Sequence, residues 1–173
     1  MVSSYLPQIN IKEIKQAYDA GEQDAVYDAL VQPLHEELYR RQTFSFVDSL
    51  SWGQQLLLTY DYLQMQANQG GFIQFINNGY IGLLPAMVEQ LYKLGANEMA
   101  QVLDDVLKVY VLNRDLLESA KSVEAFAKLY EELKEFEIID ERYSKLNKPT
   151  TKLLLDYALK HIAEFGTDAD ASS

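Results

Sequence analysis

The sequence predicts an all-α protein, folded as a single compact multi-helix domain with a strongly acidic outer face. Apolar residues recur at the three- and four-residue spacing of amphipathic helices, and no window shows sustained alternation with β-branched enrichment. The 173 residues are 48% hydrophobic, which is enough for one sizeable core. Acids outnumber bases by 26 to 15, for a net charge of −11. We expect one domain over residues 1–165 and a disordered tail over 166–173, which is small and polar.

The N-terminal part is expected to form three short helices. Residues 9–20 form the first, which ends near Gly21, and residues 22–31 form the second. Pro33 lacks a backbone N–H, and its ring clashes with a helix interior. Pro33 is therefore expected to open a new helix that continues through Arg41.

The rest of the chain also follows helical periodicity. Gly95 is expected as a left-handed C-cap, and Asn68, Asn97 and Ser122 as N-caps. Glu137 would fall on the apolar side of its helix, so an end or bend is expected there. The further helices are expected, in order, from Asp48 or Ser51 to about Ala67, over Asn68–Gly79, over Pro85–Leu94, from Asn97 through Tyr110, over 122–137 and from Pro149 to Phe165.

The residues that usually hold metals or perform catalysis are scarce. There is no cysteine, so disulfides and thiolate metal sites are excluded. His35 and His161 are preceded three positions earlier by Gln32 and Ala158, so the Glu-x-x-His pattern of di-iron bundles fails at both. No phosphate-binding glycine loop or nucleophile elbow is found. We expect no metal, no cofactor and no catalytic residue, and a protein that is not an enzyme.

Charge and hydropathy also restrict the partners and the compartment. The first sixteen residues lack a cationic stretch followed by an apolar run, so they do not form a secretory signal. The longest apolar stretch, near Ile81–Val88, contains Gly82 and Pro85 and is too short to span a bilayer. A charge of −11 disfavours nucleic acid and anionic membrane as ligands and favours a basic protein partner. A cytoplasmic location is expected.

The acids are bunched rather than scattered, and those on neighbouring helices are expected to be uncompensated by bases. Asp115 to Glu141 contains nine acids and three bases, and so carries −6 of the −11. Helical spacing places such carboxylates about 5–6 Å apart, comparable to the charge spacing of duplex DNA. The alternative is a solvated helix face that only keeps the protein soluble. The expected phosphate-mimicking residues are Glu98, Asp104, Asp105, Asp115, Glu118, Glu124, Glu131, Glu132 and Glu135, with Asp24 and Asp28 as a secondary patch.

The least random stretch is Asn68–Gly79, with the sequence NQGGFIQFINNG. Adjacent glycines remove Cβ atoms where backbones approach closely, and Gly79 can take a positive φ. One interpretation is an amide-rich ligand pocket, and the other is a tightly packed, amide-stitched helical hairpin. The second is favoured, because short amides commonly bond to nearby groups. The residues that define this motif are Asn68, Gly70, Gly71, Phe72, Gln74, Phe75, Asn77 and Gly79.

This motif resembles the signature of a bacterial helical family, the DNA-mimic-protein-19-like domain. Chain length, acidity and the lack of cysteine are also similar to the DNA-mimic member. The resemblance implies an all-α fold, a homodimer, and binding to a helix-turn-helix transcription factor in place of its operator. It assigns no mimicking residue, so the carboxylates named above come from the charge pattern alone.

These observations together predict a cytoplasmic DNA mimic. Its surface carboxylates would occupy the DNA-binding face of a dimeric helix-turn-helix repressor, block operator binding and relieve repression. Two alternatives stay open. One is a ligand-binding or enzymatic helical module that uses the Asn68–Gly79 hairpin, and the other is an interaction protein whose acidity serves only solubility.

Overall fold

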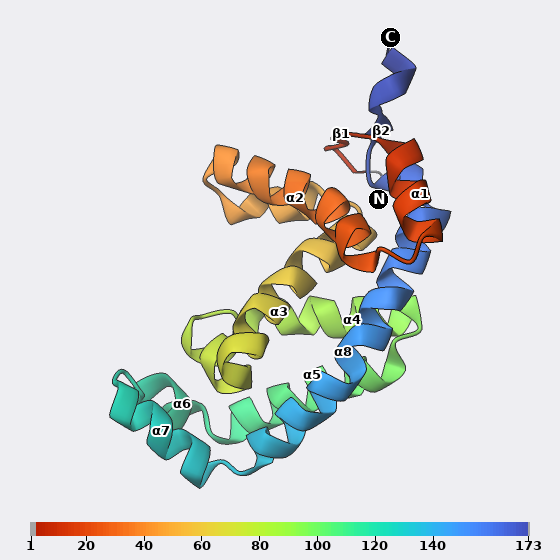
Figure 1. Cartoon of the computed structure of the whole chain (residues 1–173). Coiled ribbons are helices and arrows are strands. Elements are labelled where there is room, and N and C mark those ends of the chain that lie inside the picture. The colour runs from red at the N-terminus through yellow and green to blue at the C-terminus, as the bar shows by residue number, and fades with distance from the viewer. Residues whose placement is uncertain (1–2, 173) are drawn as a thin grey trace. The chain divides into compact units, whose positions relative to one another are not determined.

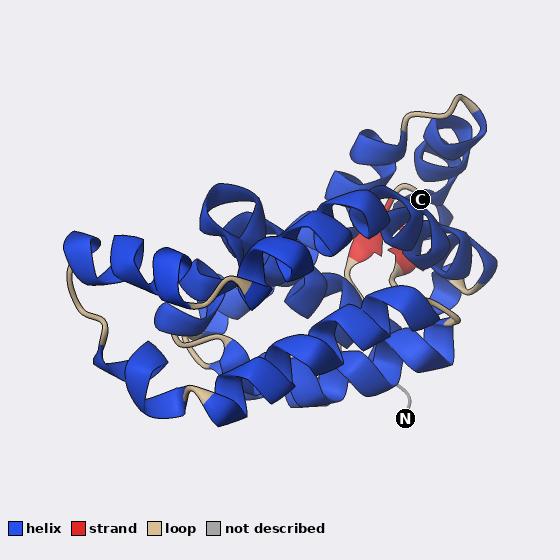
Figure 2. Cartoon of the chain, turned by 90° about the horizontal axis from the view of Figure 1, so that it is seen from below, coloured by secondary structure: helices blue, strands red, loops and turns tan. Residues whose placement is uncertain are grey.

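Helices form nearly all the regular structure in the computed structural model, which describes residues 3–172 and confirms the all-α class (Figures 1 and 2). The contacts within the chain gather into two compact units. Unit 1 comprises Met1–Leu58 and Thr151–Ser173, and unit 2 comprises Thr59–Thr150. The two long helices, α3 (Trp52–Asn77) and α8 (Glu135–Lys160), each contribute residues to both units.

Unit 1 is built around helix α2, whose apolar stripe Val26, Leu30 and Leu34 is fully buried. Burial of such a stripe is what holds an amphipathic helix in place, because its intrinsic propensity is weak. The elements that lie wholly in unit 1 are β1 (Gln8–Ile9), α1 (Ile11–Asp19), α2 (Gln23–Arg41), η1 (Phe44–Ser49), η3 (Ile162–Glu164), β2 (Thr167–Asp168) and η4 (Ala169–Ser172).

The C-terminal segment corrects one expectation. Residues 166–173 were expected to be a disordered tail, but Thr167 and Asp168 pair in parallel with β1, drawn in red in Figure 2. The Thr167 N–H donates to the Pro7 carbonyl at 2.8 Å. A Cβ on Gly166 would lie 2.6 Å from the same carbonyl, so glycine permits the close approach. Ser173 lies outside the described residues.

Pro33 does not open a helix, contrary to expectation, because α2 runs through it without interruption. An internal proline costs about 3 kcal/mol. Leu30, Val31 and Leu34 lie on both sides of it and are buried, and each such side chain stabilises by about 1.5–3 kcal/mol. Burial therefore outweighs the lost hydrogen bond. The three predicted N-terminal helices are in fact two, α1 and α2.

The boundaries of the C-terminal helices also differ from prediction. The helix expected over 122–137 is divided into α7 (Val123–Glu132) and the start of α8, because the chain leaves helical geometry at Leu133. This break buries both Leu133 and Phe136 and leaves Glu137 exposed. The final helix does not begin at Pro149 either, since Pro149 lies inside α8.

Most predicted caps are confirmed. The Ser51 hydroxyl accepts from the Gln54 N–H at 3.2 Å, and the Gln54 side chain accepts from the Ser51 N–H at 3.1 Å. This reciprocal pair is a capping box at the start of α3. Ser122 caps α7, and Gly95 ends α4 with φ 89°. Asn97 does not cap α5, because it is already the first helical residue and the preceding residue occupies the cap position.

Unit 2 contains α4 packed against α5, with apolar side chains of both helices buried. Met87 and Leu91 of α4 and Val102, Leu103 and Val106 of α5 are fully or almost fully buried. The elements that lie wholly in unit 2 are η2 (Ile81–Leu83), α4 (Leu84–Leu94), α5 (Asn97–Leu112), α6 (Arg114–Ser119) and α7 (Val123–Glu132). They are joined by residues 59–77 of α3 and 135–150 of α8.

A sharp kink at Gly70–Gly71 interrupts α3. Gly71 has φ 68° and ψ −171°, a conformation that essentially only glycine adopts. The kink restarts the helix, and the Phe72 N–H at the new start donates to the Asp140 carboxylate of α8 at 2.9 Å. Asn68 was expected to cap this helix, but it lies before the kink, and Asp140 performs the capping from another part of the chain.

Further hydrogen bonds fix the kink to α7 and α8. The Tyr130 hydroxyl donates to the Gly70 carbonyl, and the Tyr143 hydroxyl donates to the Asn68 side chain at 3.2 Å. A Cβ on Gly71 would lie 2.3 Å from an Asp140 carboxylate oxygen. The glycines therefore serve close approach, as predicted, and the approaching group is a carboxylate.

The amides of the motif bond to neighbouring amides. The side-chain oxygen Oε1 of Gln66 accepts from the Asn78 amide at 2.6 Å and from the Gln74 amide at 3.2 Å. These bonds join the segment before the kink to the segment after it. Asn77 is exposed, and Gly79 ends the second segment with φ 86°. This arrangement supports the structural interpretation of the motif, because the Asn68, Gln74 and Asn78 amides already form hydrogen bonds within the chain.

A glycine comparison tests the role of the kink. We expect Gly79→Ala to cost about 1 kcal/mol of unfolding free energy, since it places a side chain at positive φ but in open space. Gly71→Ala combines a glycine-only conformation with the collision against Asp140, so it should cost about 3 kcal/mol or more. Urea unfolding followed by circular dichroism measures both. Equal losses would mean that the Asp140 contact does not constrain this position.

The pH dependence of stability tests the half-buried carboxylate of Asp140. Burial raises the pKa of Asp140, and the Phe72 N–H only partly offsets this. A carboxyl whose pKa is higher in the folded state than in the unfolded state stabilises the fold most when it is protonated. That contribution is lost as the pH rises through the pKa of the folded state. Asp140→Asn removes this titration. The unfolding free energy of Asp140→Asn relative to wild type should therefore increase between pH 4 and pH 7.

Asp105 provides a control of opposite sign. Its burial raises the pKa, but hydrogen bonds from Arg142 and Gln101 outweigh burial and lower it. Its contribution is present above the ordinary aspartate pKa and is lost as pH falls. Asp105→Asn should therefore lose stability relative to wild type as pH rises from 4 to 7. If the unfolding free energies of both variants, relative to wild type, change in the same direction with pH, the raised pKa assigned to Asp140 is contradicted.

Candidate acidic partner-binding surface

The nine carboxylates of the predicted row all lie in unit 2, on four consecutive helices. Seven of them are exposed, as expected, whereas Asp104 and Asp105 are half-buried. The row comprises Glu98, Asp104 and Asp105 on α5, Asp115 and Glu118 on α6, Glu124, Glu131 and Glu132 on α7, and Glu135 at the start of α8.

Four members of the row are compensated by cations, which corrects the expectation that the row is uncompensated. Three have a base on the same helix at the four-residue spacing that brings side chains together. Asp105 instead pairs with Arg142 of α8, a partner that sequence spacing does not reveal. The pairs are Asp104–Lys108 at 2.9 Å, Asp105–Arg142 at 2.7 Å, Glu118–Arg114 at 2.9 Å and Glu132–Lys128 at 3.3 Å.

The other five carboxylates of the row have no ion pair within the described residues. These are Glu98, Asp115, Glu124, Glu131 and Glu135, and all are exposed. Two of the paired acids, Asp105 and Glu118, have a lowered pKa. For example, hydrogen bonds from Tyr110 and Arg114 lower the pKa of Glu118. The formal negative charge of the row is therefore unopposed by ion pairs at these five positions.

The secondary patch in unit 1 is not compensated by nearby bases. No Lys or Arg lies between Lys15 and Arg40, whereas six acids do. Asp24 and Asp28 are exposed on α2 and have no ion pair in the part of the chain that the structure describes. Unit 1 carries 12 acids and 6 bases, and unit 2 carries 14 acids and 9 bases. The negative charge is thus shared almost equally, −6 and −5, rather than concentrated on the row.

Glu37 explains why the bases at the end of α2 do not neutralise this patch. It is buried and accepts from Arg40 at 2.5 and 2.8 Å and from Arg41 at 2.7 Å. These hydrogen bonds, from Arg40 first, lower the pKa of Glu37 to about 2. The Arg41 guanidinium also lies 4.6 Å from the centre of the Phe46 ring. Both cations are therefore occupied locally, and Asp24 and Asp28 keep their charge unopposed.

Sequence reasoning missed the importance of Asp140, which it counted as one more acid of the run. The signal was present. Phe136 and Tyr143 lie four residues before and three residues after Asp140 and are both buried. Helical spacing therefore places Asp140 on the buried side of α8. The signal depends on knowing that the helix starts at Glu135, which the predicted boundary at 137 obscured.

Neither histidine is arranged for metal chemistry. His161 stacks on Tyr157 with ring centres 4.4 Å apart, and its Nδ1 lies 3.6 Å from a Glu164 carboxylate oxygen. Among residues 3–172, no group of three or more His, Asp or Glu side chains is placed to hold a metal ion. The absence of a cofactor stays a prediction. No helix in the same residues is long and apolar enough to cross a membrane.

Comparison with known families adds one finding to this geometry. The model of the DMP19-like protein family matches residues 48–161, which is more than half of the chain. The match includes the hairpin and the whole carboxylate row, and it does not include Asp24 and Asp28. A search of curated proteins finds no match. The chain belongs to the DMP19-like protein family, which takes its name from DNA mimic protein 19.

Proposed function

We propose that this protein is a DNA mimic that binds the DNA-binding face of a transcription factor and excludes DNA from it. The observation that carries the proposal is the set of exposed, uncompensated carboxylates on consecutive helices of a DMP19-like chain. A protein surface that binds DNA presents Lys and Arg at the spacing of phosphates. Carboxylates held on helices offer such a surface fixed negative charges.

The mechanism is competitive. The carboxylates stand in for phosphates, the repressor is titrated from its operator, and repression is relieved. A dimeric helix-turn-helix repressor recognises two half-sites related by a two-fold axis. A homodimer of this chain would duplicate the acidic surface by the same symmetry. These features of the proposal rest on the family membership and on the distribution of charge.

The two acidic surfaces have different parts in this proposal. The row of unit 2 lies within the family match and contains the five uncompensated carboxylates, so it is assigned the phosphate-mimicking role. The hairpin is assigned a structural role, because its glycines accommodate Asp140 and its amides bond to one another. No observation favours it as a ligand or catalytic site.

Competition with DNA is the first test. The immobilised protein is used to capture helix-turn-helix proteins from lysate, and each captured protein is then bound to its own operator in a gel shift. Adding the mimic should release free DNA, since one surface cannot hold both. The complex between the mimic and the captured protein should weaken as salt rises. The dependence should be less steep than for the complex with operator DNA, because a folded protein has no dense layer of condensed counterions to release. A supershifted ternary complex would refute competition.

Charge reversal locates the mimicking surface. Glu131→Lys with Glu135→Lys should weaken displacement of operator DNA at least about tenfold, through repulsion from the basic partner. Asp48→Lys with Glu89→Lys changes net charge equally at exposed acids outside the row, and it should stay near wild type. Circular dichroism should show unchanged helicity in both variants. If the Glu131/Glu135 variant displaces DNA as well as wild type does, the row is not the mimicking surface.

A further inference from the structure

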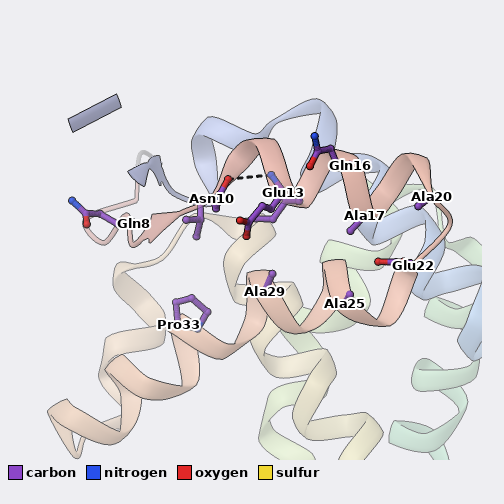
Figure 3. Close-up of a pocket in the computed structure, with 12 residues that line it drawn as sticks. Gln8, Asn10, Glu13, Gln16, Ala17, Ala20, Glu22, Ala25, Ala29 and Pro33 are labelled. Atoms are coloured by element: carbon purple, nitrogen blue, oxygen red, sulfur yellow. Dashed lines mark hydrogen bonds between the residues drawn. The ribbon is translucent and has the colours of Figure 1, made fainter. Parts of the chain in front are cut away.

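A groove lies between α1 and α2 of unit 1, outside the region of the family match (Figure 3). It has a volume of about 660 Å³. Its walls are made mainly of small residues, and Figure 3 shows Ala25, Ala29 and Pro33 of α2 turned toward α1. The α1–α2 groove is lined by Gln8, Ile9, Asn10, Glu13, Ile14, Gln16, Ala17, Ala20, Glu22, Ala25, Ala29 and Pro33.

The α1–α2 groove is an open trough rather than an enclosed pocket. Ala20, Ala25 and Ala29 are exposed, so part of its apolar wall faces water. Alanine side chains allow another backbone to approach closely, and burying their methyl groups is favourable. The side chains of Gln8 and Gln16 carry amides, which can bond to the backbone of an extended chain. A trough with these walls suits a peptide segment better than a small molecule, which needs to be enclosed on most sides.

The charge of the α1–α2 groove indicates that a peptide bound there would be basic. Glu13 and Glu22 line it, and neither has an ion pair in the described part of the chain. The two bases of α1, Lys12 and Lys15, are exposed and do not line it. The lining of the groove therefore contains two carboxylates and no base.

Carboxylates also border the α2 wall. Asp28 follows Ala25 by three positions, and Glu36 follows Pro33 by three positions. Residues at this spacing lie along one side of a helix, so both acids flank the groove. Glu37 holds Arg40 and Arg41, which removes the nearest bases of α2 from this side. A ligand in the groove therefore meets carboxylates along the α2 side, next to exposed alanines.

We propose that the α1–α2 groove binds a short extended segment rich in Lys or Arg, interspersed with small side chains, from a basic protein partner. The small residues of the segment lie on the alanine wall, and its cations pair with Glu13 and Glu22. The inference deepens the proposed function by giving the basic partner a second contact surface, separate from the carboxylate row. It rests on the proposed function only for the identity of the partner, because the groove and its charge are properties of unit 1.

The probe is a fluorescent nine-residue peptide of alternating arginine and alanine, with a glutamate–alanine peptide of equal length as the control. Fluorescence anisotropy with the full chain measures affinity, and amide chemical shifts locate the site. We expect saturable binding of the arginine peptide alone, with the largest shifts at Glu13, Ala17, Glu22, Ala25 and Ala29. Binding should weaken with salt.

Two matched variants separate groove binding from general attraction to an acidic protein. Ala29→Lys places a cation in the groove at an exposed helical position, and it should weaken peptide binding at least tenfold. Ala163→Lys makes the same change at an exposed alanine of unit 1 outside the groove, and it should leave binding within about twofold of wild type. Unchanged melting temperatures show that both variants are folded.

Three outcomes would overturn the proposal. Equal weakening by Ala29→Lys and Ala163→Lys would mean that only net charge matters. Shifts confined to the carboxylate row of unit 2 would place the cationic segment elsewhere. Groove shifts that appear with rising protein concentration and no peptide would make a second copy the occupant. None of these bears on DNA displacement, so the failure of this inference and the failure of the proposed function are distinguishable.

Discussion

The bond between the Asp140 carboxylate and the Phe72 N–H is the contact on which the organisation of unit 2 depends. It satisfies the first free donor after the kink in α3, where a buried helix start would otherwise be costly. The same carboxylate occupies the space that a side chain at Gly71 would need. One group on α8 thereby fixes the backbone of α3, and Tyr130 joins α7 to the same point through the Gly70 carbonyl. The acids of α7 and α8 are carried by helices held in this way.

The surface of the protein stays negative because several of its bases pair with acids close to them in the chain. Lys108, Arg114 and Lys128 each pair with an acid on their own helix, and Glu37 holds Arg40 and Arg41. The exposed pairs made by Lys108, Arg114 and Lys128 add little stability, typically about 0.2–1 kcal/mol each. Their larger effect is on the distribution of surface charge. Each cation is bound to an acid near it in the chain, so other carboxylates are left without a neutralising partner. The result is two anionic surfaces, the row of unit 2 and the outer side of α2.

Buried and exposed acids have opposite effects in this protein. Asp140 is half-buried, and its burial makes ionisation less favourable. Its role is to accept the Phe72 hydrogen bond and to fill the space next to Gly71. Glu131 and Glu135 are exposed, and their value lies in charge. Glu37 is buried but bonded to two guanidinium groups, which keeps it ionised. A count of 26 acids does not separate these classes, because the side-chain environment decides which class each belongs to.

The sequence by itself determined the all-α class, the caps at Ser51, Gly95 and Ser122, and the outward direction of most carboxylates, because these follow from local spacing and cap chemistry. Tertiary structure decided the features that depend on distant partners. Burial kept α2 and α8 helical through their prolines, Asp140 replaced Asn68 as the cap, and Arg142 compensated Asp105. The α1–α2 groove likewise arises only when two helices pack side by side. Such contacts join residues far apart in the chain, and the periodicity of a single sequence holds no information about their pairing.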